Sequence, residues 1–60
     1  MGFAENLKEI RTKRNITQEQ LAEVLSVSRQ TISKWESGLG YPETEKLLSI
    51  SKELNVSLDY

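Results

Sequence analysis

The sequence contains no cysteine and no histidine, and it has only one proline and three glycines among its 60 residues. Without cysteine no disulfide can stabilise the fold, and nothing indicates an oxidising compartment. A structural zinc site would have to use carboxylates alone, which is not how such sites are built. The chain therefore lacks histidine, the usual general base, and cysteine, the strongest nucleophile. It also has no phosphate-binding glycine loop. We therefore expect no metal, no cofactor and no enzyme activity.

Long apolar runs are absent as well. No stretch approaches the roughly 20 residues that a membrane span requires, and residues 1–5 lack the basic segment and apolar run of a signal peptide. We therefore expect a cytoplasmic protein with no membrane partner. The formal net charge is −1, so the chain lacks the overall basic excess that nucleic-acid binders show. Binding to nucleic acid would require the basic residues to be sorted onto one face.

Most of the chain is free to form helices. Apolar spacing predicts helices over about residues 4–13, 17–25, 29–37 and 43–53, and the start of another at residue 57. We therefore expect the all-α class. A chain of 60 residues makes one domain near the lower size limit for folding without staples. The unfinished last helix predicts that residues 1–60 are the N-terminal part of a longer chain.

Local signals predict where these helices begin and end. Thr17 with Gln20 three residues later forms a capping box for the second helix. Ser28 is placed to cap the third helix, and Gly38 to end it. Asn15 is predicted to end the first helix in a left-handed conformation. The second and third helices are therefore short and joined by a tight turn.

The apolar spacing also predicts which side chains face the core. In the first helix, Phe3, Leu7, Ile10 and Arg14 follow the spacing of one face. Trp35 could serve as a platform for stacking bases, but its position three residues after an isoleucine favours core packing. The other predicted inward residues are Leu21, Ala22, Leu25, Val27, Ile32, Leu47, Ile50, Ser51 and Leu54.

The opposite side of the third helix carries hydrogen-bonding side chains at i, i+1, i+4, i+5 and i+8, which form one outward stripe. Its members are Arg29, Gln30, Ser33, Lys34 and Ser37. Considered alone, this stripe could be an ordinary solvated face. Its position directly after the predicted cap gives it a second interpretation, which depends on the wider pattern of the chain.

That wider pattern resembles the Cro/C1-type helix-turn-helix family, also called the Xre family. The resemblance covers nearly the whole chain. It implies a compact, lambda-repressor-like bundle of four or five helices, in which the second and third helices read DNA and most members regulate transcription as dimers. The residues that carry it are Thr17, Gln18, Leu21, Ala22, Leu25, Val27, Ser28, Thr31, Ile32, Ser33, Trp35, Glu36, Gly38, Pro42, Leu47, Ile50, Ser51, Leu54 and the segment 56–60.

The resemblance implies that the third helix enters the DNA major groove, where residues near its N-terminus reach base edges. Arg29 has the fork that bonds guanine O6 and N7, and Gln30 can bond adenine N6 and N7. Lys34 can bond either guanine or phosphate. The implied base contacts are Ser28, Arg29, Gln30, Ser33 and Lys34.

Phosphate contacts are implied at the start of the second helix and in the loop after the third. Gln18 corresponds to a family glutamine that meets a phosphate together with the free amides of the first turn. Relatives often carry Lys or Arg in the loop after the third helix, where this chain has an apolar stretch with one tyrosine. The implied phosphate contacts are Thr17, Gln18, Thr31 and Tyr41.

Two further features follow from the resemblance. Arg11 and Glu36 match positions that form a partly buried ion pair in several relatives, which ties the first helix to the end of the third. The apolar residues near the loop and the C-terminal end have two interpretations, ordinary helix packing or a two-fold dimer patch, and both remain open. The residues of this patch are Leu39, Tyr41, Leu58 and Tyr60.

The expected function is a sequence-specific DNA-binding transcriptional regulator, a repressor of prokaryotic or phage type, that binds double-stranded DNA as a homodimer. The alternative is a protein-interaction module of the same fold, such as an antitoxin or coactivator-like domain with a protein partner. The acidic second helix and the loop without basic residues favour this alternative. Salt dependence distinguishes the two, since DNA binding weakens steeply as salt rises.

Overall fold

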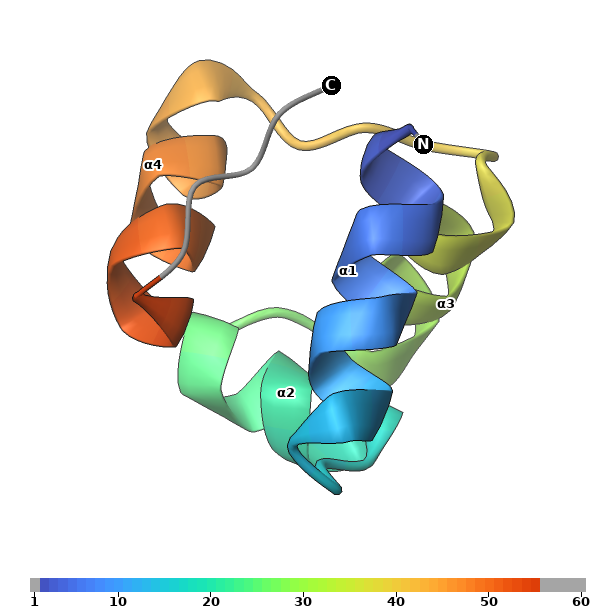
Figure 1. Cartoon of the computed structure of the whole chain (residues 1–60). Coiled ribbons are helices and arrows are strands. Elements are labelled where there is room, and N and C mark those ends of the chain that lie inside the picture. The colour runs from blue at the N-terminus through green and yellow to red at the C-terminus, as the bar shows by residue number, and fades with distance from the viewer. Residues whose placement is uncertain (1, 56–60) are drawn as a thin grey trace.

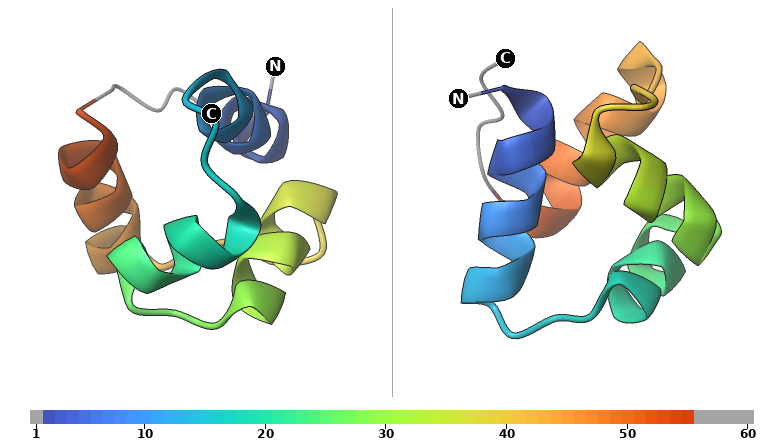
Figure 2. Two further views of the ribbon diagram at one scale, coloured as in Figure 1. Left: turned by 90° about the horizontal axis from the view of Figure 1, so that it is seen from below. Right: turned by 90° about the vertical axis from the view of Figure 1, so that its right-hand side faces the viewer.

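Four α-helices joined by short loops make up residues 2–55, which the computed structural model describes: α1 (Phe3–Lys13), α2 (Gln18–Leu25), α3 (Arg29–Ser37) and α4 (Thr44–Leu54). Helix α3 packs against both α1 and α2, and α4 packs against α2 (Figure 1). Figure 2 (left) shows α2 between α3 on one side and α4 on the other. The expected all-α class is confirmed. The helix expected from residue 57 lies outside the described residues.

The predicted helix ends agree with the structure to within one residue. Helix α1 begins at Phe3 rather than at residue 4, and α4 ends at Leu54 rather than at residue 53. Thr17 and Gln20 form the complete capping box. Gly38 follows α3 with φ +77°, and Asn15 follows α1 with φ 57°. Side-chain caps therefore set the starts of α2 and α3, whereas α1 and α4 begin without one. A residue with positive φ follows each described helix.

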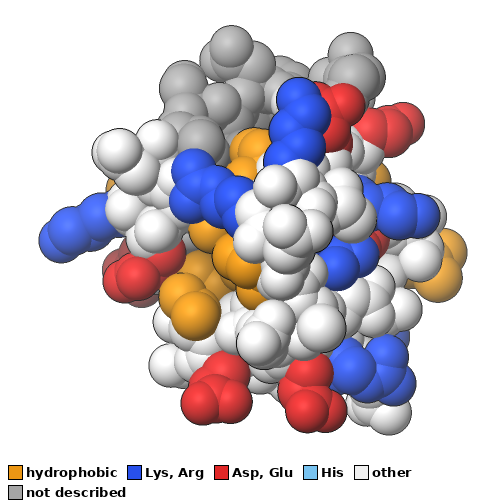
Figure 3. All heavy atoms as spheres, turned by 60° about the horizontal axis from the view of Figure 1, so that its bottom comes forward, with side chains coloured by type: hydrophobic (Ala, Val, Ile, Leu, Met, Phe, Trp, Pro, Cys, Tyr) orange, Lys and Arg blue, Asp and Glu red, His pale blue; other side chains and the backbone are white. Residues whose placement is uncertain are grey.

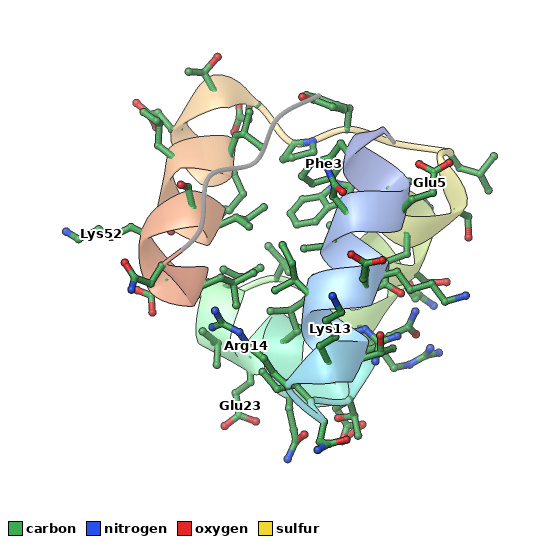
Figure 4. The ribbon with its side chains drawn as sticks, in the orientation of Figure 1. Phe3, Glu5, Lys13, Arg14, Glu23 and Lys52 are labelled. Atoms are coloured by element: carbon green, nitrogen blue, oxygen red, sulfur yellow. The ribbon has the colours of Figure 1, made fainter. Side chains whose placement is uncertain are left out.

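The core lies where the inner faces of the helices meet. Its fully buried centre is formed by one side chain each of α1, α3 and α4 and by two of α2, namely Leu7, Ile32, Ile50, Leu21 and Leu25. Trp35 packs beside them, with 7% of its surface exposed. Trp35 is therefore a core residue, as predicted. Phe3 also points inward, whereas Glu23 and Lys52 point away from the bundle (Figure 4). Helix α1 ends at Lys13, as predicted, so Arg14 lies just beyond the helix and its side chain is exposed.

The turn between α2 and α3 contains a strained residue that the sequence did not indicate. Ser26 has φ 58° and ψ 43°, in the left-handed region. The next residue, Val27, donates its backbone N–H to the Ala22 carbonyl at 2.9 Å and packs its side chain partly buried against the core. A left-handed residue costs roughly 1–2 kcal/mol when it carries a Cβ. Burial of Val27 and closure of the turn hold Ser26 in that conformation.

Helix α4 contributes a second contact that closes this corner. The Lys46 ammonium donates a hydrogen bond to the Leu25 carbonyl, with 3.0 Å between Nζ and the oxygen. Leu25 is the last residue of α2, so its carbonyl has no partner within the helix. A cation at a helix C-terminus is also favourable with respect to the helix dipole. Lys46 therefore holds the C-terminal end of α2 against α4.

We predict that Ser26→Gly stabilises the protein. Glycine removes the free-energy cost of the left-handed conformation, about 1–2 kcal/mol. The greater backbone entropy of glycine in the unfolded chain offsets roughly 0.5–1 kcal/mol of this stabilisation. The net gain of about 0.5–1 kcal/mol should raise the melting temperature by roughly 2–8 °C in a domain of this size. Thermal unfolding followed by circular dichroism measures it.

The matched control is Ser33→Gly, which places the same change inside α3. It should lower stability by about 0.5 kcal/mol, because glycine disfavours a helix interior. A lower melting temperature for Ser26→Gly would show that the turn is not strained in solution.

Candidate nucleic-acid interface

The outward stripe predicted on α3 is present in the structure. Arg29, Gln30 and Lys34 are exposed and Ser33 is half-buried; we call these four residues the reading face. The isoleucine and tryptophan of the same helix are buried in the core. Packing of the apolar side of α3 therefore determines which way the reading face points.

Charged side chains of both signs lie on the surface of the domain. Figure 3 shows lysine and arginine side chains spread over the face in view, with carboxylates mainly toward its edges. The whole chain carries eight basic and nine acidic residues. The basic residues are therefore not gathered into one broad patch on the face in view, and Arg29 and Lys34 are the two cations of the reading face.

The start of α2 is a capped helix N-terminus at the surface. The Gln20 N–H donates to the Thr17 hydroxyl at 3.0 Å, and the Thr17 N–H donates to the Gln20 side-chain oxygen at 2.9 Å. This capping box leaves the first-turn N–H groups of Gln18 and Glu19 pointing out of the helix. Such groups bind anions because they donate hydrogen bonds to the anion, and the helix dipole places partial positive charge at the same end of the helix.

Ser28 and Thr31 are hydrogen-bonded to each other. The Ser28 hydroxyl accepts the Thr31 backbone N–H at 3.2 Å, and the two side-chain hydroxyls lie 2.9 Å apart. Both side chains thus serve the start of α3 in the unbound protein. Their contacts with base and phosphate remain predictions, and each contact requires the hydroxyl to bond DNA in addition to its neighbour.

The structure contains the ion pair expected between α1 and α3. Arg11 Nε and Nη2 donate to the two carboxylate oxygens of Glu36 at 2.6 and 3.1 Å, and Nη1 donates to the Ile16 carbonyl at 2.8 Å. The Arg11 and Glu36 side chains are only 12% and 4% exposed. The paired, bidentate geometry is the strong form of this interaction.

The same carboxylate also reaches the start of α2. Gln18 Nε2 donates to Glu36 Oε1 at 3.1 Å. On its other side, the Gln18 side-chain oxygen accepts a hydrogen bond from Arg29 Nη1 at 3.4 Å. Gln18 and Arg29 were each expected to contact DNA, but their contact with each other was not expected. Their separation of 11 residues matches no local motif, so the sequence offered no signal for this contact.

The loop after α3 forms an apolar hollow with the start of α1. The Tyr41 ring packs on Phe3 with 5.0 Å between ring centroids, and Phe3 packs edge-on against Trp35 at 6.4 Å. The open hollow beside these rings has a volume of about 570 Å³. Leu39, at its edge, is 80% exposed and Tyr41 is 52% exposed. These residues belong to the predicted dimer patch, whereas Leu58 and Tyr60 lie outside the described residues.

Comparison with known proteins agrees with this geometry. The chain belongs to the helix-turn-helix family of the Cro/C1 type, whose family model, described as "Helix-turn-helix", matches residues 7–60. Members of this family are in general not enzymes. Among residues 2–55, no three histidine, cysteine or acidic side chains are grouped so that they could hold a metal ion. No helix in the same part of the chain combines the length and apolar character that crossing a bilayer requires.

Three relatives illustrate the family. The chain is 59% identical over 59 residues to the HTH-type transcriptional activator BcrR of Enterococcus faecalis, covering 98% of this chain and 29% of BcrR. It is 38% identical to the HTH-type transcriptional regulator ImmR of Bacillus subtilis, covering 100% of this chain and 47% of ImmR. It is 39% identical to Repressor protein C2 of Salmonella phage P22, covering 97% of this chain and 27% of that repressor. The chain thus spans between about a quarter and a half of these relatives.

We predict that Glu36→Ala strongly destabilises the fold. It leaves the nearly buried Arg11 guanidinium without its counter-charge, which costs about 3–5 kcal/mol. That is a large part of the roughly 3–9 kcal/mol expected for a domain of 60 residues. Urea denaturation followed by circular dichroism should show a much lower midpoint or loss of helix in buffer.

Glu9→Ala is the matched control, because Glu9 pairs with Lys13 at 3.7 Å while both side chains stay at least half exposed. Its effect should stay within about 0.5 kcal/mol, as for other exposed pairs. Equal denaturation midpoints for the two variants would contradict a structural role for the buried pair.

Proposed function

We propose that this chain is the sequence-specific DNA-binding domain of a transcriptional regulator, and that it binds double-stranded DNA as a two-fold dimer. The observation that carries the proposal is the reading face. A helix fixed by its apolar side against the core presents a row of long polar side chains outward, next to the capped N-terminus of a second helix. Family membership and the names of the relatives support the same function.

The proposed mechanism inserts α3 into the major groove. That groove is roughly 12 Å wide in B-DNA and accepts a helix with its side chains. Arg29 and Gln30, in the first turn of α3, bond the edges of guanine and adenine, and Lys34, one turn later, bonds guanine or phosphate. Thr17, Gln18 and the amides of the first turn of α2 hold a neighbouring phosphate, and this contact sets the register of α3 in the groove.

Two subunits are needed because one supplies little electrostatic attraction. The chain has a net charge of −1, and counterion release by cations is the main source of affinity that does not depend on sequence. Doubling the contacts in a two-fold complex offsets this weakness. The half-sites would then lie about 34 Å apart, one helical turn of DNA. Leu39 and Tyr41 offer an exposed apolar surface for the contact between subunits.

The relatives differ in the sign of regulation that their names give. The relatives' names include an activator that is 59% identical and a phage repressor that is 39% identical over nearly the same residues. Activation and repression of transcription both require recognition of a DNA site, and this is the step that we propose for the shared domain. We broaden the expected repressor accordingly to a regulator.

Selection of bound duplexes from a random pool tests the proposed function. We expect enrichment of a palindromic motif with half-sites about 10 base pairs apart, and binding that weakens steeply as salt rises. Failure to enrich any motif would contradict the proposal. It would favour the alternative of a protein-interaction module that uses the apolar hollow and Leu39.

We predict that Arg29→Ala weakens binding to the selected duplex by about 1–3 kcal/mol and relaxes the preference at one base pair per half-site. The physical reason is loss of a bidentate contact to one guanine. Fluorescence anisotropy with the selected duplex and with single-base variants of it measures both effects.

Lys52→Ala is the control, because Lys52 is exposed on α4 and points away from the bundle (Figure 4). It should leave the base preference unchanged. A uniform loss of affinity for every sequence after Arg29→Ala would show that Arg29 contacts phosphate rather than a base.

A further inference from the structure

Gln18 lies between a nearly buried carboxylate and the first residue of the reading face. Its side-chain nitrogen donates to Glu36 Oε1 at 3.1 Å, and its side-chain oxygen accepts from Arg29 Nη1 at 3.4 Å. Gln18 is half-buried and Arg29 is exposed. The contacts therefore run continuously from the interior, at Glu36, to the surface, at Arg29.

The chemistry of the three groups fixes the direction of these bonds. A carboxylate only accepts hydrogen bonds and a guanidinium only donates them, whereas a glutamine amide has a donor end and an acceptor end. Glu36 therefore attracts the NH₂ end of Gln18, and the carbonyl end has to face Arg29. If the amide were reversed, oxygen would face carboxylate and NH₂ would face guanidinium, and both contacts would be repulsive.

The arrangement leaves donors available on both residues. The NH₂ group of Gln18 has a second N–H beyond the one given to Glu36, and this N–H can meet a phosphate. Arg29 uses Nη1 toward Gln18, which leaves Nη2 and Nε for the bidentate contact to guanine. Holding the long Arg29 side chain in place before binding also reduces the rotamer freedom that it loses in the complex.

We propose that Glu36, beyond its pairing with Arg11, is a positioning residue for base recognition: it orients the Gln18 amide, which in turn orients the Arg29 guanidinium. This inference rests on the proposed DNA-binding function. The Glu36 side chain is 4% exposed and acts through Gln18. The pair that holds α1 to α3 thus also controls how well the protein distinguishes one base pair.

The test measures base discrimination in two variants, Glu36→Gln and Gln18→Leu. Discrimination is the ratio of the dissociation constants for the selected duplex and for its variant at the base pair that Arg29→Ala relaxes. Each variant should lower this ratio about three- to tenfold, the factor that corresponds to the net value of one hydrogen bond. Discrimination at the other base pairs should not change, because Thr17 and the first-turn amides of α2 still hold the phosphate that sets the register of α3. Neither variant should change the ratio in an Arg29→Ala background.

Gln18→Leu keeps the test valid if Glu36→Gln folds poorly, because it leaves the Arg11–Glu36 pair in place. Gln20→Leu is the matched control on the same helix, since Gln20 bonds the Thr17 backbone rather than Glu36 or Arg29. It should leave discrimination unchanged.

The outcomes separate the two proposals. If the unaltered protein selects a motif but Gln18→Leu weakens all duplexes equally, or changes nothing, the positioning role is overturned while the proposed function stands. If no motif is selected, the proposed function fails and the positioning role fails with it.

Discussion

The Arg11–Glu36 ion pair is the interaction on which the arrangement of the first three helices depends. It joins α1 to α3, and the remaining contacts of the two side chains reach the carbonyl of Ile16 and the start of α2 at Gln18. Two charges with this little exposure are tolerated only when their hydrogen bonds are satisfied. Among the described residues no buried side-chain polar atom lacks a partner. The pair therefore selects one relative position of these segments, while the apolar core supplies most of the stability.

This constraint explains how a weakly charged domain can present a specific surface. The core holds α3 by its apolar side, and Lys46 and the left-handed Ser26 fix the corner between α2 and α3. The reading face therefore keeps its direction before any ligand is present. Preorganisation of this kind reduces the entropy lost on binding, which matters most where the net charge offers little long-range attraction.

The sequence predicts the helices well because their signals are local. Thr17 with Gln20, Ser28 and Gly38 each act within one turn of the helix that they begin or end. Contacts between helices are different, because they depend on crossing positions that no local pattern encodes. The Arg11–Glu36 pair spans 25 residues and was expected only from the family resemblance. The bond of Lys46 to Leu25 and the bonds of Gln18 to Glu36 and Arg29 were not expected at all. The DNA contacts of the reading face stay predictions.

If Glu36 orients Gln18 in the free protein, the Gln18 side-chain amide must be nearly rigid there. ¹⁵N relaxation of the Gln18 side-chain amide measures this directly, with the exposed Gln30 amide as internal reference. We expect an order parameter close to that of rigid backbone, about 0.85, for Gln18 in the unaltered protein, and a value below about 0.6 in Glu36→Gln under conditions where the variant remains folded. If the Gln18 amide were as mobile as that of Gln30 in the unaltered protein, Glu36 would not position it, and the orientation of Arg29 through Gln18 would be contradicted.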